Sequence, residues 1–405
     1  MSAAKRPCQS CPILPVRPKP GILLRRGVWL WTLLLLLAVA AMAACVPSSV
    51  VSTATPAPAA KSTLTPAVTP TSAPAASAPT IAPQPATVKV GVLRSGGEGG
   101  LYVAMERGYL KELGITIETT VFSTSGDMIA PLGRGDLDLG NGAVTAGLYN
   151  AVGRGIPLVV PAGTSQLPKG STFTAFMVRK DLFDSGTIKT PADLKGKIYS
   201  KTPGKGTASD LALDMLLKQG NITEKDIQIQ ELSFPDMVAA FSGKKIDFAY
   251  VTEPYVTAAA EAGVAVRWIP AGDLLPGAQV GSWLASPQFV KERRDVAKRW
   301  MVGVMRGSRD FADAFFKNKG GKEDIAKILT KYTAVTDPAV HLKVAQPYLT
   351  PNGYVNKKSL QDQLNFHVQR GIVTEKVDFN SILDDGIVDY AISVLGKYED
   401  VPGVN

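Results

Sequence analysis

Hydrophobic and polar positions change places at short intervals from about residue 87 onward. Residues 88–92 alternate and are rich in β-branched side chains, which predicts a strand. The apolar residues that follow recur at helical spacing, at Leu101, Met105, Tyr109 and Leu110. The same reasoning predicts strands at 115–121, 137–139 and 157–162 and short helices at 128–132 and 143–152. Strands that alternate with helices predict a mostly parallel sheet covered on both faces.

A second series of strand and helix units begins near Phe173. Thr190-Pro191-Ala192-Asp193 has the composition of a capped helix start. Strands are predicted at 197–200, 227–232, 248–251 and 280–285, and helices at 207–219, 236–241, 254–262 and about 286–316. We therefore expect a two-lobed α/β fold with a central cleft. The expected parts are lobe 1 (87–172), lobe 2 (173–285), and a return segment with C-terminal helices (286–405) that packs mostly on lobe 1.

The first 44 residues have the pattern of an export signal. Arg25 and Arg26 precede a leucine-rich apolar run at 28–44, which ends in Met42-Ala43-Ala44-Cys45. This ending resembles a bacterial lipobox, with Met42 where leucine is usual, and it implies cleavage before Cys45 and lipidation of Cys45. An uncleaved membrane anchor is the alternative interpretation. Both interpretations place the rest of the chain outside the cytoplasm.

Residues 45–86 consist mainly of Pro, Ala, Ser, Thr and Val. Such a composition buries too little apolar surface to offset the entropy of the chain, so we expect a disordered linker. Proline favours extended conformations, which makes the linker a semi-rigid spacer. A lipidated cysteine, a spacer and a folded body are typical of a receptor that is tethered to the cell membrane.

The basic charge of the chain belongs mainly to the leader. The formal net charge is +9, but six Lys and Arg and no acidic residue precede Cys45, which leaves +3 for the rest. This distribution argues against nucleic-acid binding. The cysteines Cys8, Cys11 and Cys45 all precede the body, and the two histidines, His341 and His367, lie far from them. We therefore expect no disulfide, no metal and no cofactor in the body.

Several phrases of the sequence together resemble one protein family. They are VKVGVLRSGGEGGLYVAMERGYLKELGITIE, APLGRGDLDLGNG, RGIPLVV, ADLKGKIYSKTPGKGTASDLALDMLL and SGKKIDFAYVTEP. In this order and spacing they are similar to the solute-binding proteins for nitrate, sulfonates, taurine and the thiamine pyrimidine precursor. The resemblance implies the type II periplasmic-binding-protein fold, whose two lobes close on a ligand. It also implies a monomer without enzymatic activity that delivers a small-molecule solute to the permease of an ABC importer.

The candidate ligand-binding residues lie at the ends of predicted strands. Glycines there leave backbone N–H groups accessible, and helix N-termini add partial positive charge. Lobe 1 supplies the candidates Ser95, Gly96, Gly97, Asn141, Gly142 and Thr164, and lobe 2 supplies Gly206, Thr207, Ser209 and Glu253. Structural alternatives exist for each cluster, because capped turns, a helix-capping Asn141 and a helix-start Glu253 would need no ligand.

Two features bear on the solute and its use. The loop at 95–100 is glycine-rich where the family has a proline or an aromatic residue, and Glu253 in a cleft would oppose a simple anion. We therefore expect an organic solute, either sulfonate- or taurine-like or a nitrogen heterocycle, with nitrogen favoured. A sensory receptor is an alternative function. An enzyme similar to the pyrimidine synthase of this fold is a further alternative, although that chemistry uses a cysteine-rich segment that the body lacks.

Overall fold

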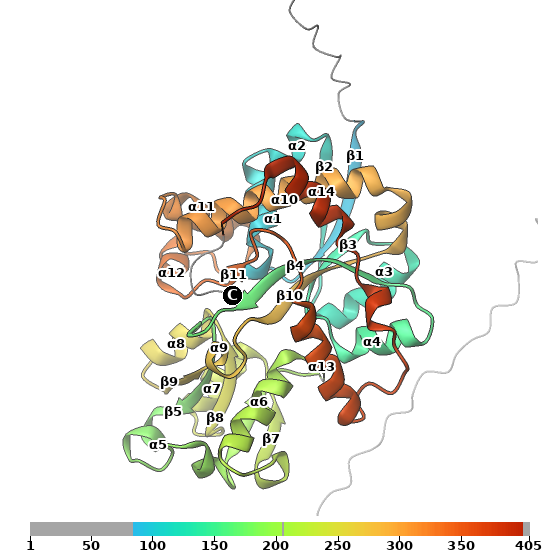
Figure 1. Ribbon diagram of the computed structural model, residues 1–405. Coiled ribbons are helices and arrows are strands. Elements are labelled where there is room, and N and C mark those ends of the chain that lie inside the picture. Colours follow the sequence, from blue (N-terminus) through green and yellow to red (C-terminus); the bar gives the residue numbers. More distant parts are fainter. Residues whose placement is uncertain (1–83, 205, 400–405) are drawn as a thin grey trace, which may run out of the picture. The chain divides into compact units, whose positions relative to one another are not determined.

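The computed structural model describes residues 84–204 and 206–399, which form two lobes (Figure 1). The predicted signal peptide, Cys45 and the predicted linker up to residue 83 lie outside the described residues. Ala86, the last residue of the predicted linker, already belongs to the first strand. No helix within the described ranges has the length and apolar character needed to cross a membrane.

Lobe 1 is built on a six-stranded sheet with the order β11-β4-β10-β3-β1-β2. Its strands are β1 (Ala86–Val92), β2 (Ile115–Val121), β3 (Leu139–Gly142), β4 (Val159–Leu167), β10 (Ala278–Ala285) and β11 (Tyr348–Leu349). β1 pairs in parallel with β2 and β3, but β10 is antiparallel to both β3 and β4. The prediction of a mostly parallel sheet is therefore wrong for lobe 1, because β10 and β11 both pair antiparallel. The reason is topological, since β4 carries the chain out to lobe 2 and β10 brings it back.

Lobe 2 is built on a five-stranded sheet with the order β7-β6-β8-β5-β9. Its strands are β5 (Thr174–Arg179), β6 (Ile198–Lys201), β7 (Gln228–Glu231), β8 (Phe248–Thr252) and β9 (Ala265–Pro270). β6 is parallel to β7 and β8, whereas β5 is antiparallel to β8 and β9. The sequence pattern does not predict β9, because Arg267 and Pro270 interrupt its short apolar run.

Helices pack on both faces of each sheet, and each face has its own hydrophobic cluster. Lobe 1 contains α1 (Gly99–Glu106), α2 (Tyr109–Glu112), α3 (Ile129–Arg134) and α4 (Ala146–Gly153). Lobe 2 contains α5 (Lys180–Asp184), α6 (Ala208–Gln219), α7 (Phe234–Ser242), α8 (Tyr255–Glu261) and α9 (Ala271–Leu274). The chain then continues through α10 (Arg294–Phe315), α11 (Lys322–Tyr332), α12 (Pro338–Lys343), α13 (Lys357–Gln369) and α14 (Gly386–Leu395).

The segment after β10 differs from the single long helix that the sequence predicts. Residues Gln288–Glu292 form a π-helical turn, and α10 begins only at Arg294. Arg293 between them leaves the helical region, with φ −109° and ψ 37°. Its guanidinium donates to Asp138 Oδ1 at 2.8 Å and to the Thr87 carbonyl at 2.6 Å. The break therefore lets Arg293 tie α10 to the strands of lobe 1.

Helix α10 packs closely on α1, and this contact explains part of the glycine-rich 95–100 loop. A Cβ on Gly100 would lie 2.1 Å from Ser308 Oγ, and a Cβ on Gly307 would lie 2.1 Å from the Gly100 carbonyl oxygen. Only glycine allows the two backbones to approach this closely. The close approach of α1 and α10 accompanies a hydrophobic cluster between these helices and the sheet. In it, Trp283 of β10 packs edge to face on Trp300 of α10, with ring centroids 4.9 Å apart.

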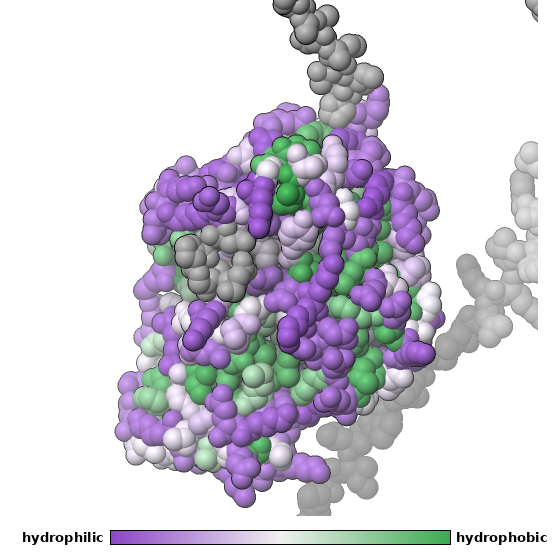
Figure 2. Space-filling view, in the orientation of Figure 1, coloured by the Kyte–Doolittle hydropathy of each residue, from purple (hydrophilic) through white to green (hydrophobic). Residues whose placement is uncertain are grey.

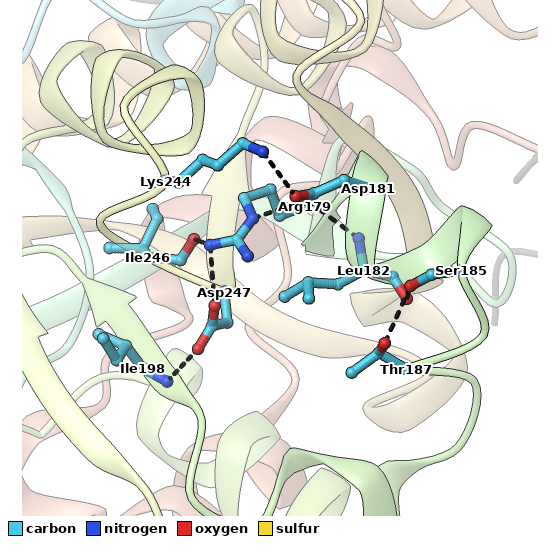
Figure 3. Close-up of polar contacts among 9 residues, drawn as sticks. All are labelled: Arg179, Asp181, Leu182, Ser185, Thr187, Ile198, Lys244, Ile246 and Asp247. Atoms are coloured by element: carbon cyan, nitrogen blue, oxygen red, sulfur yellow. Dashed lines mark hydrogen bonds and ion pairs between the residues drawn. The ribbon is translucent and has the colours of Figure 1, made fainter.

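A charged network fastens the end of lobe 2 that lies opposite the carboxyl ends of β6 and β8 (Figure 3). Arg179, at the end of β5, donates to Asp247 Oδ1 at 2.9 Å and to the Ile246 carbonyl at 3.2 Å. Asp247 Oδ2 accepts the Ile198 N–H at 2.9 Å, which joins the start of β6 to the same group. Asp181 accepts a hydrogen bond from Arg179 at 2.7 Å and forms an ion pair with Lys244, and both Asp181 and Lys244 are exposed.

Helix α13 spans the two lobes, since it packs on β10 and α4 and also on α6 (Figure 1). Figure 2 shows a largely hydrophilic face on which hydrophobic residues gather near α9, α6 and α13, where the lobes meet. His367 of α13 is fully buried there, and neither ring nitrogen has a hydrogen-bond partner among the described residues. Burial lowers the pKa of His367.

Replacement of Arg179 by Ala should destabilise lobe 2. The Asp247 carboxylate, which is mostly buried, would lose its charged partner, and such a loss costs about 1–3 kcal/mol. The measurement is the midpoint of urea unfolding. Lys244→Ala is the matched control, because its pair with Asp181 is exposed and is worth less than about 1 kcal/mol. Equal losses in the two variants would contradict this role for Arg179.

Stability should fall as the pH drops below about 6.5, and His367 should contribute to the fall. The unfolded chain protonates His367 near its ordinary pKa, whereas the buried ring resists protonation, so the unfolded state binds more protons in this window. His367→Leu should flatten the loss of the free energy of unfolding between about pH 6.5 and pH 5, measured by urea titration at each pH. An unchanged slope would show that His367 has no such role.

Candidate functional site

The turn after β1 is held by a buried carboxylate. Ser95 caps the one-turn helix η1 (Gly96–Glu98), and Glu98 is fully buried beneath it. The Glu98 carboxylate accepts the Leu93 N–H at 2.7 Å, the Ser95 N–H at 2.8 Å and the Ser95 hydroxyl at 2.7 Å. Burial raises the pKa of Glu98 despite these bonds. The Ser95 hydroxyl is thus used within the turn, which fixes the partly buried Gly96 and Gly97 in place.

Asn141 of β3 faces this turn. A Cβ on Gly97 would lie 3.5 Å from Asn141 Oδ1, so the two residues are in close contact. Asn141 is 3% exposed, and its Nδ2 has no hydrogen-bond partner in the described part of the chain. A buried donor without a partner costs free energy unless another group, such as a ligand or a water molecule, satisfies it. Asn141 is therefore the strongest lobe 1 candidate.

Thr164 of β4 belongs to the same region. Gly97 and Thr164 line one small cavity, which has room for about one water molecule. Thr164 is 7% exposed, and its Oγ1, like Asn141 Nδ2, lacks a partner among the residues described. The structure thus brings together Gly97, Asn141 and Thr164. Two further polar side chains, Ser308 and Thr350, line the same cavity, and no sequence pattern predicts them because they lie far along the chain and belong to no motif.

Gly142 lies next to Asn141, but it serves packing. A Cβ on Gly142 would lie 2.4 Å from the Ser125 Cβ, so glycine lets the one-turn helix η2 (Ser125–Met128) approach β3. The following helix, α4, is capped by Thr145, whose Oγ1 accepts the Leu148 N–H at 3.3 Å. Helix α4 is thereby capped by Thr145 and not by Asn141, so the helix-cap alternative for Asn141 is wrong.

The lobe 2 candidates at the start of α6 bond to one another and to Asp210. The Asp210 carboxylate accepts the Gly206 N–H at 2.7 Å and the Thr207 N–H at 3.2 Å. Lys201 also donates to Asp210, at 2.9 Å, and the hydroxyls of Thr207 and Ser209 are 2.7 Å apart. The N–H groups that the sequence offers to a ligand are in this conformation held by a carboxylate three or four residues further on.

The start of α6 touches lobe 1 directly. The Ala146 N–H, at the first residue of α4, donates to the Gly206 carbonyl oxygen at 3.0 Å. The loops that follow β3 and β6 therefore face one another across the boundary between the lobes. This is the arrangement that the sequence analysis expects for a site formed from both lobes.

Glu253 is engaged within lobe 2. Its carboxylate accepts the Thr257 N–H at 2.9 Å and the Thr257 hydroxyl at 2.8 Å, and Arg267 donates to it at 3.3 Å. The side chain is 2% exposed. Glu253 thus stabilises the start of α8, which is the alternative to ligand binding that its sequence position allows. Arg267 balances its charge.

The assembled site offers neutral hydrogen-bonding groups. Asn141 Nδ2 and Thr164 Oγ1 are available, whereas the carboxylates of Glu98, Asp210 and Glu253 are already bonded. The described residues include no group of three or more His, Cys, Asp or Glu arranged to hold a metal ion. His341 is bonded to Thr333 and to the Val335 carbonyl. The arrangement is suited to binding a polar molecule.

Comparison with known proteins gives matches both in sequence and in fold. A taurine-binding periplasmic protein of Escherichia coli (strain K12) is 26% identical over 284 residues, which cover 65% of this chain and 81% of that protein. The structure of the periplasmic aliphatic sulphonate binding protein of Escherichia coli aligns with a TM-score of 0.59 at 22% identity, covering 74% of this chain and 92% of that one. A desulfurization enzyme aligns with a TM-score of 0.55 at 14% identity, covering 76% and 99%.

These structural similarities confirm the predicted two-lobed periplasmic-binding-protein fold and its C-terminal helices. They do not fix the function, because a binding protein and an enzyme share the fold. The sequence relationship is narrower, since residues 98–314 match the family model described as NMT1/THI5 like. As this match extends over more than half of the chain, the protein belongs to the NMT1/THI5-like family.

Proposed function

We propose that this protein is an extracytoplasmic solute-binding lipoprotein of an ABC importer. It captures a small organic solute between its two lobes and presents it to the permease, and the lipidated Cys45 anchors it in the membrane. Membership of the NMT1/THI5-like family and the relationship to a taurine-binding periplasmic protein support this function. The cysteine at the end of the leader and the proline-rich linker support the anchor.

One observation carries the proposal. Two buried polar groups at the carboxyl end of the lobe 1 sheet, Asn141 Nδ2 and Thr164 Oγ1, lack partners among the described residues. They lie beside the glycine turn at 96–97, on the side from which α4 meets α6 of lobe 2. A ligand that supplies hydrogen-bond acceptors would satisfy the amide nitrogen of Asn141 and remove the cost of burying it.

The solute class follows from the same groups. A neutral amide and a hydroxyl can donate to the oxygens of a sulfonate or carboxylate, and the charge of Glu253 is balanced by Arg267. The Glu253 carboxylate therefore no longer favours a nitrogen-containing solute over a sulfonate. We propose a sulfonate- or taurine-like solute first and a nitrogen heterocycle, such as a thiamine pyrimidine precursor, second.

Closure requires the lobes to move about their connections. The chain crosses between lobes at the end of β4 and again at the start of β10, with α13 alongside. Small backbone changes in such crossovers are enough for hinge motion. The proposed parts are lobe 1 (87–172), lobe 2 (173–285) and the return segment (286–405), except that β10 (Ala278–Ala285) pairs within the sheet of lobe 1.

Asn141→Asp should weaken taurine binding about 10- to 100-fold, measured by calorimetry, because it replaces a donor with a negative acceptor. The matched control is Asn365→Asp on the exposed face of α13, which adds the same charge away from the site. Equal affinities in the two variants would rule out Asn141 as a ligand contact. If wild-type protein binds none of taurine, alkanesulfonates and the thiamine pyrimidine precursor, the proposed solute class is wrong.

Glu253→Gln separates the two roles of Glu253. We expect a loss of about 1–3 kcal/mol in the free energy of unfolding, because the bonds to Thr257 and Arg267 weaken. Taurine affinity should change less than about threefold, since the carboxylate is not directed at the solute. The exposed Glu118→Gln is the control for the lost charge. A large change in affinity at unchanged stability would instead make Glu253 a ligand contact.

An enzyme of this fold would change its bound molecule. The protein is incubated with one pure compound, such as taurine, and denatured, and the released molecule is identified by mass spectrometry. The result distinguishes a binding protein from an enzyme. Unchanged solute at a stoichiometry near one is expected for a binding protein. A converted product would support an enzyme.

A further inference from the structure

The contact between Gly206 and Ala146 joins the lobes at the two helix starts. The Gly206 carbonyl oxygen accepts the Ala146 N–H at 3.0 Å. This N–H belongs to the first turn of α4, where backbone donors have no partner inside the helix. Both residues are buried, so water is excluded from the bond.

Only glycine fits on the lobe 2 side of this contact. A Cβ on Gly206 would lie 2.1 Å from the Ala146 Cβ and 2.8 Å from the Ala146 nitrogen. The φ angle of Gly206 is also +81°, which L-residues with side chains rarely adopt. Sterics and backbone conformation therefore select glycine independently.

Hydrogen bonds within lobe 2 hold Gly206 in place. Asp210 accepts the Gly206 N–H at 2.7 Å, and Lys201 bonds both to Asp210, at 2.9 Å, and to the Gly204 carbonyl, at 3.0 Å. The carbonyl of Gly206 is thereby directed at lobe 1 by groups that all belong to lobe 2.

The other polar links between the lobes are more exposed. Arg370, at the end of α13, pairs with Glu224 at 2.5 Å and with Asp214 at 3.6 Å, and Lys343 of α12 pairs with Glu261 of α8. Exposed ion pairs contribute little because solvent screens them and their long side chains lose entropy. Among the polar links that join the lobes in the described residues, the buried Gly206–Ala146 bond is therefore the one best placed to determine how closely the lobes approach.

We propose that Gly206 is a positioning residue that holds the lobes closed through its backbone carbonyl, and that it does so without contacting the solute. Closure of this kind sets the separation between the lobe 1 donors and lobe 2 in the absence of solute. The inference rests on the proposed function only in its consequence for affinity, because the contact itself joins two residues of this chain.

The test measures the distance between the lobes without solute. Spin labels at Glu118→Cys in lobe 1 and Lys195→Cys in lobe 2, both exposed, report the distance in the full chain with its three native cysteines replaced by serine. Gly206→Ala should raise the ratio of long to short distances about tenfold. Gly204→Ala is the matched control, since Gly204 also has a positive φ, +110°, but nothing lies within 4 Å of its added Cβ.

A second variant removes the donor instead. Ala146→Pro deletes the N–H at the first position of α4, where proline is favoured, and Thr145 before it already has the extended conformation that proline requires. It should open the lobes as Gly206→Ala does, with thermal melting as the check on folding. Distances in Ala146→Pro and Gly206→Ala that match the Gly204→Ala control would overturn the proposal.

Failure of this inference is distinct from failure of the proposed function. If wild-type protein binds taurine and the lobe distances do not respond to either variant, solute capture stands and the role of Gly206 is wrong. If the distances respond and no tested solute binds, Gly206 keeps its role and the solute class is wrong.

Discussion

The fold depends on two antiparallel strands of lobe 1, β4 and β10, through which the chain passes to lobe 2 and back. β4 leaves lobe 1 and β10 returns to it, and the two strands pair side by side in the middle of the lobe 1 sheet. Trp283 of β10 then packs on Trp300 of α10, so the returning strand also carries the contact that fixes the longest helix. Both crossing strands are therefore anchored in the core of lobe 1, and only the short segments outside the sheet connect it to lobe 2.

The same crossings explain where the candidate site lies. They bring the ends of β3 and β4 to the side of lobe 1 that faces lobe 2, and they leave Asn141 and Thr164 buried there without partners among the described residues. Close packing completes the arrangement, since Gly142 admits Ser125 and Gly100 admits Ser308. The glycines that the sequence suggests as ligand-binding residues thus have two roles. Gly96 and Gly97 lie in the turn beside Asn141, whereas Gly100 and Gly142 allow helices to pack closely.

The sequence predicts the fold to a large extent because short-range patterns determine its elements. The strand predicted at 115–121 coincides with β2, and the helix predicted at 207–219 coincides with α6 and its Thr207 cap. Strand direction was not predictable from these patterns, as it depends on where the chain returns. The break at Arg293 was missed for a similar reason, since its partners Asp138 and Thr87 lie far away in sequence.

The candidate site shows the same limit. Asn141 and Gly97 were found from their places at strand ends, but the bonding of Glu253 to Thr257 and Arg267 and of Gly206 to Asp210 depends on side-chain geometry. A motif indicates that a donor is present, and it does not show whether the protein itself already uses that donor.

The order of the chain has a consequence for how the protein is made. The strands of lobe 2 come from one uninterrupted segment, β5 to β9, whereas the lobe 1 sheet needs β10 between β3 and β4. During synthesis from the N-terminus, lobe 2 can therefore complete its sheet while that of lobe 1 still lacks a central strand. Until β10 and α10 emerge, the face of β1, β3 and β4 that packs on α10 stays incompletely covered, and an intermediate with exposed apolar surface is prone to aggregation and proteolysis.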